Sequence, residues 1–155
     1  MGITSAICST FKKELMTATH NFTTTSGNTM KVALIKAQAS QTGTYSAATT
    51  SYTTITGNSD ELANGNGYTT GGNSLTNVTP TNGTSTTTTA LTDFADSSWT
   101  SATFTTRGCV IYNDSASGDP AVMVIDFGAD YSVAGGTFTI QFPTADESNA
   151  ILRIT

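Results

Sequence analysis

The sequence predicts a mainly β protein: an antiparallel β-sandwich, jelly-roll-like, with about eight strands and one N-terminal amphipathic helix. Three observations predict it. Short apolar runs alternate with polar or glycine-containing gaps along residues 100–142. Signals typical of turns recur roughly every 8 to 12 residues. Strand patterns do not alternate with helix patterns, so a parallel sheet is not expected. The length of 155 residues predicts a single domain, residues 1–155.

Residues 100–142 are predicted to supply the hydrophobic centre as an antiparallel meander of four short strands. In the last of these, Phe138 and Ile140 alternate with threonines, which is typical of a strand with one solvated face. Residues 121–127 are apolar on both faces, which indicates a central strand. Residues 113–120 combine Asn, Asp, Ser, Gly and Pro, and this composition predicts a turn.

A single helical pattern covers residues 3–19. Ile3, Ile7, Phe11 and Leu15 recur every four residues and would form one apolar stripe. Such a helix either packs on its own body, which is the commoner arrangement, or docks on a partner subunit. Ile7, Phe11 and Leu15 are therefore candidate partner contacts.

A long polar loop region is expected over residues 38–70, after a central strand at residues 30–37. One weak strand is predicted around residues 52–56 within this region. Its tyrosines lie among Gly, Ser and Asn, a composition found in binding loops. These rings either bind a partner or pack on the sheet, and both interpretations stay open. The candidates from this region are Tyr45, Tyr52 and Tyr68.

A hairpin is expected where residues 72–79 and 86–94 flank the dipeptide Asn82-Gly83, a pair favoured in tight turns. The chain then bends at Trp99, the one tryptophan, which is expected to anchor either the core or a subunit contact. Residues 149–155 are predicted to form the last strand.

The composition argues against several classes of function. Charged residues make up 11% of the chain, well below the average of about 25%, and 34 threonines occupy much of the remaining surface. The net charge of −5 and the absence of a basic run argue against nucleic-acid binding. No apolar run reaches the length of a membrane span. Cys8 and Cys109 are expected to be buried, reduced thiols.

No catalytic, metal or cofactor site is expected, and the protein is not expected to be an enzyme. His20 is the one histidine, and its place after the helix favours a capping or packing role. Most acids lie at strand ends and turns, where they bind local backbone donors. Asp126 falls inside an apolar strand, and it either lies on a wet edge or pairs with Arg107, Lys31 or Arg153.

An ordered series of short motifs runs along nearly the whole chain. In order, the motifs are STFKKELM at 9–16, HNF at 20–22, MKVALI at 30–35, GYTTGG at 67–72, DFADSSW at 93–99, GCVIYN at 108–113, IDFG at 125–128, GTFTI at 136–140, FP at 142–143 and AILRI at 150–154. In this series the chain resembles a group of small structural proteins of tailed bacteriophages. The resemblance implies no catalytic residues.

The resemblance implies a virion component, and within that class we favour a capsid decoration, or cement, protein. Such a protein is made in the bacterial cytoplasm, binds the outer surface of the major capsid protein shell and often forms a homotrimer. The alternatives are a tail, neck or baseplate protein, or a sugar-binding module that stacks Tyr45, Tyr52, Tyr68 or Trp99 on sugar rings.

Overall fold

The computed structural model describes residues 1–85 and 87–155. Within these residues the protein is mainly β, as predicted, with ten strands rather than about eight, two α-helices and one short 3₁₀ helix. The elements are β1 Gly2–Ile3, β2 Ala6–Ile7, α1 Ser9–Met16, β3 Met30–Lys36, η1 Gln38–Ser40, β4 Thr44–Tyr45, α2 Thr53–Gly57, β5 Asn73–Ser74, β6 Asn77–Asn82, β7 Ala90–Phe94, β8 Ser97–Asn113, β9 Ala121–Ile140 and β10 Leu152–Ile154.

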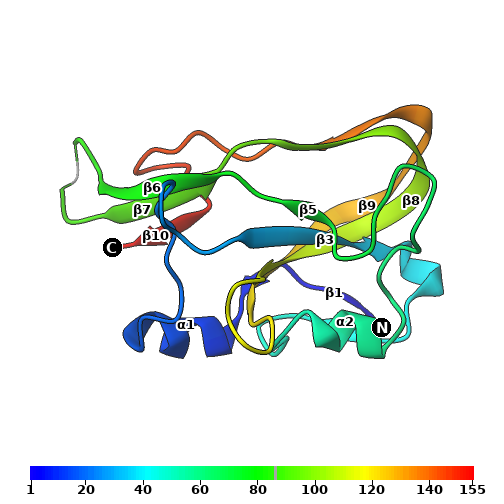
Figure 1. Ribbon diagram of the computed structural model, residues 1–155, viewed down its shortest axis with the longest axis horizontal. Helices are drawn as coiled ribbons and strands as arrows, with labels where there is room; N and C mark the ends of the chain where they lie inside the picture. Colours follow the sequence, from blue (N-terminus) through cyan, green and yellow to red (C-terminus); the bar gives the residue numbers. More distant parts are fainter. Residues whose placement is uncertain (86) are drawn as a thin grey trace.

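Two antiparallel sheets carry the fold. The larger has the strand order β2-β9-β8-β3-β5 and the smaller has the order β10-β7-β6. Buried apolar residues from both sheets belong to one cluster, which extends from Ile3 to Leu152 and gives a sandwich-like arrangement. Helices α1 and α2 lie on the same side of the molecule (Figure 1). The strand orders of these two sheets do not confirm the predicted jelly roll. Strands β1 and β4 form a separate, parallel pair.

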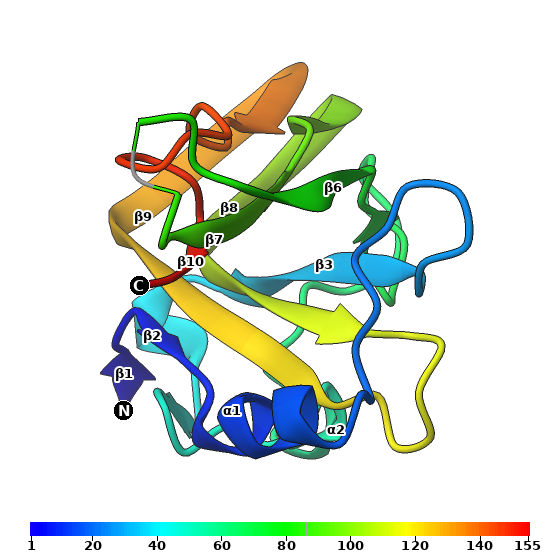
Figure 2. The ribbon, with the colours of Figure 1, turned by 90° about the vertical axis from the view of Figure 1, so that its left-hand side faces the viewer.

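Strands β8 and β9 form one long, bent ribbon instead of the four short strands predicted for residues 100–142. They pair from Ser97 and Ile140 to Tyr112 and Ala121, with several shifts of register. Ser101 and Gly128 have positive φ values of 51° and 83° in the bent region. Irregularities of this kind increase the bend of a ribbon without ending it. Figure 2 shows β9 turning sharply between its two halves.

Strand β3 confirms the central strand expected near residues 30–37. Val32, Ala33, Leu34 and Ile35 are all fully buried. The strand lies between β8 and β5, so its neighbours cover both edges. The predicted turn at residues 113–120 is also confirmed, because it joins β8 to β9.

The predicted helix over residues 3–19 is wrong in its first half. Ile3 and Ile7 lie in the short strands β1 and β2, and α1 begins only at Ser9. Ile3 is buried in the core, so tertiary pairing overrides the helical spacing here. The helix ends after Met16, where Ala18 adopts a φ of 56° and the Thr19 N–H donates to the Glu14 carbonyl.

Residues 38–70 carry more structure than predicted. They include η1, β4 and α2, and α2 replaces the strand predicted around residues 52–56. Threonine favours strands, but Ile55 of α2 is fully buried, and packing on the core decides the local conformation.

The hairpin predicted at Asn82-Gly83 forms from β6 and β7, but with a longer loop. Asn82 pairs with Ala90, and the Gly83 N–H donates to the Thr89 carbonyl. Residue 86, the predicted start of the second strand, lies outside the described residues. The predicted last strand is present as β10, which pairs with β7.

Candidate functional site

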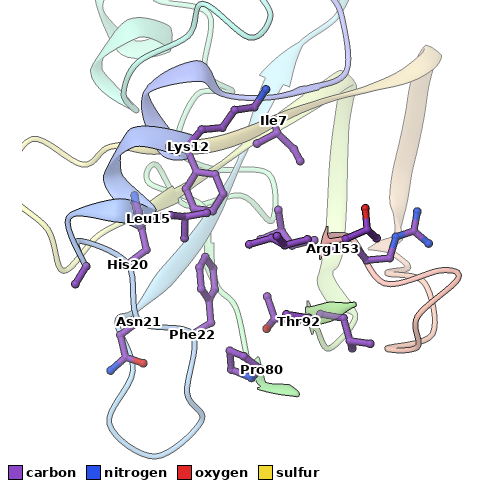
Figure 3. A pocket seen from close by; sticks show the side chains of 16 residues that line it. Ile7, Lys12, Leu15, His20, Asn21, Phe22, Pro80, Thr92 and Arg153 are labelled. Atoms are coloured by element: carbon purple, nitrogen blue, oxygen red, sulfur yellow. The ribbon is translucent and has the colours of Figure 1, made fainter. Parts of the chain in front are cut away.

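An open groove of about 860 Å³ separates helix α1 from the smaller sheet. One wall consists of α1, the end of β2 and the segment after the helix, and the other consists of β7 and β10 (Figure 3). The apolar residues that line it include Ile7, Phe11, Leu15, Phe22, Leu152 and Ile154. The groove is larger than a second hollow described below and is lined mainly by apolar side chains.

Aromatic rings connect the first wall to the rest of the core. Phe11 of α1 is buried and meets the edge of Phe22, with 6.0 Å between ring centroids. Phe22 in turn lies 6.2 Å from Phe94 of β7. These contacts fix the distance between the helix and the smaller sheet, and so they fix the width of the groove.

The register of β10 on β7 builds the second wall. Leu152 pairs with Thr92 and Ile154 pairs with Ala90, so these four side chains share one face of the sheet. Ile154 is 63% exposed, although large aliphatic side chains are usually buried. The wall therefore presents apolar surface that nothing in the described chain covers.

His20 lies in the groove lining but is already fully bonded. Asn113 Nδ2 lies 3.1 Å from His20 Nδ1, and the same Nδ2 also contacts the Thr19 and Asn28 oxygens, so this atom is the donor. His20 Nδ1 is therefore the acceptor, and Nε2 carries the proton and donates to Glu14 over 2.9 Å. The expected packing role of His20 fits this arrangement.

Two cations, Lys12 and Arg153, line opposite walls of the groove. Both side chains are exposed, and neither forms an ion pair with any described carboxylate. Figure 3 shows Lys12 on the helix side and Arg153 on the β10 side. The rim of the groove is therefore positively charged, although the whole chain carries a net charge of −5.

The structure brings three of the predicted contact residues together. Ile7, Phe11 and Leu15 all line the groove. Helix α1 also packs against β9 of its own body, as the commoner of the two expected arrangements requires. Ile7 belongs to β2 rather than to the helix, but it still faces the same groove.

The other predicted contact residues are buried or, in the case of Tyr52, partly buried. Tyr45, Tyr68 and Trp99 are at most 3% exposed. Tyr45 donates to the buried Asp60 over 2.6 Å. Tyr52 stacks on Tyr112 with 4.5 Å between ring centroids. Tyr45, Tyr68 and Trp99 therefore pack in the core, which is the other interpretation left open for these rings, and Tyr52 is partly buried against it.

Sequence reasoning missed most of the second wall. It did not place Leu152, Arg153 or Ile154 on this surface, and on the helix side it also missed Phe22 and Lys12. The alternation of apolar and polar residues in Leu152-Arg153-Ile154 predicts a strand with one apolar face. Which surface that face adjoins depends on the pairing with β7, and the sequence carries no signal for this pairing.

A second, smaller hollow of about 320 Å³ lies on the outer half of β9. Phe127, Tyr131, Phe138 and Phe142 line it together with aliphatic residues. It contains no charged side chain, and Tyr131 is 50% exposed.

The remaining reactive groups serve the fold. Cys8 and Cys109 are buried and free, as predicted, and burial raises the pKa of Cys8 to about 12, with a further contribution from the charge of Glu14. Asp126 pairs with Arg107 over 2.7 Å, one of the partners expected, and this hydrogen bond lowers the pKa of Asp126. Both thiols are thus poor nucleophiles.

Residues 1–85 and 87–155 contain neither a cluster of metal-binding side chains nor a helix that could span a membrane. No group of three His, Cys, Asp or Glu side chains converges there as a metal site would require. None of the helices in those residues combines the length and the apolar character needed to cross a bilayer.

Comparison of the chain with protein families, with curated proteins and with solved structures finds no match in any of the three.

Proposed function

We propose that this protein is a structural component of a bacteriophage virion that works by adhesion. In particular, we propose a capsid decoration protein that binds the outer surface of the major capsid protein shell and stabilises it. The observation that carries the proposal is the apolar groove between α1 and β10, with exposed Ile154 and a positively charged rim. Uncovered apolar concave surfaces on folded proteins usually mark binding sites.

The outer faces of the ribbon also support a role on a particle surface. Ser98 and Thr139 bond across β8 and β9 over 2.7 Å, and Thr105 and Ser132 do the same. Such cross-strand hydroxyl pairs stabilise exposed strands without charge. An exterior rich in hydroxyl groups suits a protein that is held by one surface and faces solvent with the rest.

The test begins with purified particles of the phage that encodes this chain. Mass spectrometry is expected to find the protein in the particles at many copies, and an electron density map is expected to place it on the outside of the shell. Density at local threefold positions is the expected result for a homotrimer. Absence from the particles would overturn the proposal, and density on the tail, neck or baseplate would replace it with that alternative.

A second measurement tests stabilisation directly. A ligand that binds only the intact shell stabilises that state, so particles with the protein are expected to release their genome at a higher temperature. The matched control is a particle produced without the protein and reconstituted with the purified protein. An unchanged release temperature after full occupancy would contradict the cement role while leaving adhesion intact.

A further inference from the structure

We infer that the groove between α1 and β10 takes an acidic polypeptide segment with apolar side chains, supplied by a partner protein. The inference rests on the proposed adhesive function and names the chemistry of the partner's contact. It has three parts: the apolar lining, the positive rim and the uncovered edge of β10.

The apolar lining requires apolar side chains in the occupant. Phe11, Leu15 and Phe22 line the helix side, and Leu152 and Ile154 line the sheet side. The two sets come from elements that are distant in the sequence, and the groove lies between helix α1 and the smaller sheet. Removing such surface from water is favourable in proportion to the area covered.

The positive rim selects negative charge in the occupant. Three of the six cations in the chain already have partners elsewhere on the protein. Lys31 pairs with Asp114 over 3.3 Å, and Arg107 pairs with Asp126. Lys36 is bonded to the Ser59 carbonyl.

The other three cations in the chain, Lys12, Lys13 and Arg153, form no ion pair with the described carboxylates. Two of these three line the groove. Arg153 also contributes to the lowered pKa of Asp146, after the hydrogen bonds from Asn149 and Ser148, but the two charges do not touch. Complementary charge on a partner would therefore find cations that are free to receive it.

The edge of β10 favours a polypeptide over a compact ligand. β10 is an outer strand of its sheet, and no described strand pairs with its second edge. The consecutive residues Leu152, Arg153 and Ile154 all line the groove, so the strand borders it along its whole length. Extended segments bind such edges through backbone hydrogen bonds and place alternate side chains in adjoining hollows.

The experiment uses the full chain and two fluorescein-labelled probes. One probe is a peptide of alternating leucine and glutamate, and the other is a peptide of alternating leucine and lysine. Fluorescence anisotropy at low salt is expected to show saturable binding of the acidic probe and at least tenfold weaker binding of the basic one. Equal binding of the two probes, or no binding of the acidic probe, would overturn the inference.

Variants locate the site. Lys12→Glu and Arg153→Glu are each expected to weaken binding of the acidic probe by about fivefold, because each replaces an attraction with a repulsion. The matched control is Lys13→Glu, which changes the net charge equally on the same helix but lies outside the groove. An effect of Lys13→Glu equal to that of Lys12→Glu would show nonspecific attraction and overturn the assignment.

A second pair of variants tests the apolar lining of the groove. Ile154→Asp is expected to abolish binding, whereas Met16→Asp, at a side chain that is 83% exposed and outside the groove, is expected to leave binding unchanged. Because both side chains are exposed, both variants are expected to fold, and circular dichroism checks this. A binding loss in Met16→Asp equal to that in Ile154→Asp would count against the groove.

Two other occupants are distinguished directly. Displacement of the acidic probe by sodium dodecanoate at a lower concentration than unlabelled probe would overturn the inference in favour of a small amphipathic ligand. Self-association by sedimentation that Ile154→Asp abolishes would assign the groove to a second copy of the chain. If particles contain the protein but Lys12→Glu and Arg153→Glu are incorporated as well as the original chain, the inference fails and the proposed function stands.

Discussion

The hydroxyl of Tyr68 donates a hydrogen bond to the Glu61 carboxylate over 2.7 Å inside the core. The same hydroxyl accepts from the Leu34 N–H at 3.1 Å. Glu61 also accepts from the Tyr52 hydroxyl and from the Gly71 N–H, each at 2.6 Å. A single carboxylate therefore holds residues 52–71 against strand β3.

Removing the Tyr68 hydroxyl tests this connection. Tyr68→Phe is expected to lower the free energy of unfolding by about 1–3 kcal/mol, because it leaves the buried Leu34 N–H without a partner and removes one of the three donors to the Glu61 carboxylate. Urea unfolding followed by circular dichroism measures the change. Tyr131→Phe is the control, because Tyr131 is half exposed and its hydroxyl makes no hydrogen bond with the described residues. Equal losses in the two variants would refute the role of the buried hydroxyl.

Asp60 is expected to make the free energy of unfolding depend on pH in the acidic range. Burial alone would raise its pKa, but hydrogen bonds from Tyr45, Gly43 and Thr42 outweigh burial and lower the pKa below its usual 3.8. Because the folded-state pKa lies below the unfolded one, the stabilisation is present above about pH 4 and is lost as the pH falls through the folded value.

The corresponding variant is Asp60→Asn. It is expected to be less stable at neutral pH and to lose less stability between about pH 5 and pH 2 than the original chain. Chemical unfolding at a series of pH values measures both effects. Asp119→Asn removes the same charge from a carboxylate that has no hydrogen bond with the described residues, and it should leave the acid dependence unchanged. A pH profile of Asp60→Asn that parallels the original would contradict this account.

Both thiols are expected to react only after unfolding. Cys8 and Cys109 have no exposed surface, and burial raises the pKa of each thiol. The native protein should therefore show almost no labelling by a thiol-specific disulfide reagent at neutral pH, while both thiols should react in guanidinium. Fast labelling of either thiol in the native protein would contradict this expectation, and labelling of Cys8 alone would show that the N-terminal strands open locally.

Close backbone approach is expected to make Gly72 intolerant of a side chain. A Cβ at Gly72 would overlap the Val32 carbonyl group, and the φ of Gly72 is also positive, at 71°. Gly72→Ala is expected to destabilise the protein by several kcal/mol, measured as a shift of the thermal midpoint. Gly65→Ala shares the positive φ but meets no atom within 4 Å, so it isolates backbone strain and should cost only about 1 kcal/mol. Similar losses in both variants would assign the effect to strain alone.

The sequence was most informative where burial on two faces leaves little choice. Residues 30–36 are apolar on both faces, and only a central strand accommodates that pattern over so short a length. The turn at residues 113–120 was equally clear, because its residues favour turn conformations whatever surrounds them. These features are local, and local patterns can be read without knowing the partner strand.

Predictions failed where distant contacts decide the conformation. Ile3 and Ile7 match a helical stripe, yet they extend as strands because β4 and β9 pair with them. Gly128 looks like the end of a strand, but it bends β9 without stopping it. The candidate site also depends on distant contacts, since Leu15 and Ile154 line one groove only after β10 has paired with β7.

Pairing between remote segments also sets the order in which the chain can fold during synthesis. Ala6 and Ile7 pair with Val124 and Met123, so strand β2 has no partner until most of the chain has left the ribosome. Sheets closed by such distant contacts form slowly. A nascent chain halted before residue 121 would leave Ile7 unpaired and prone to aggregation.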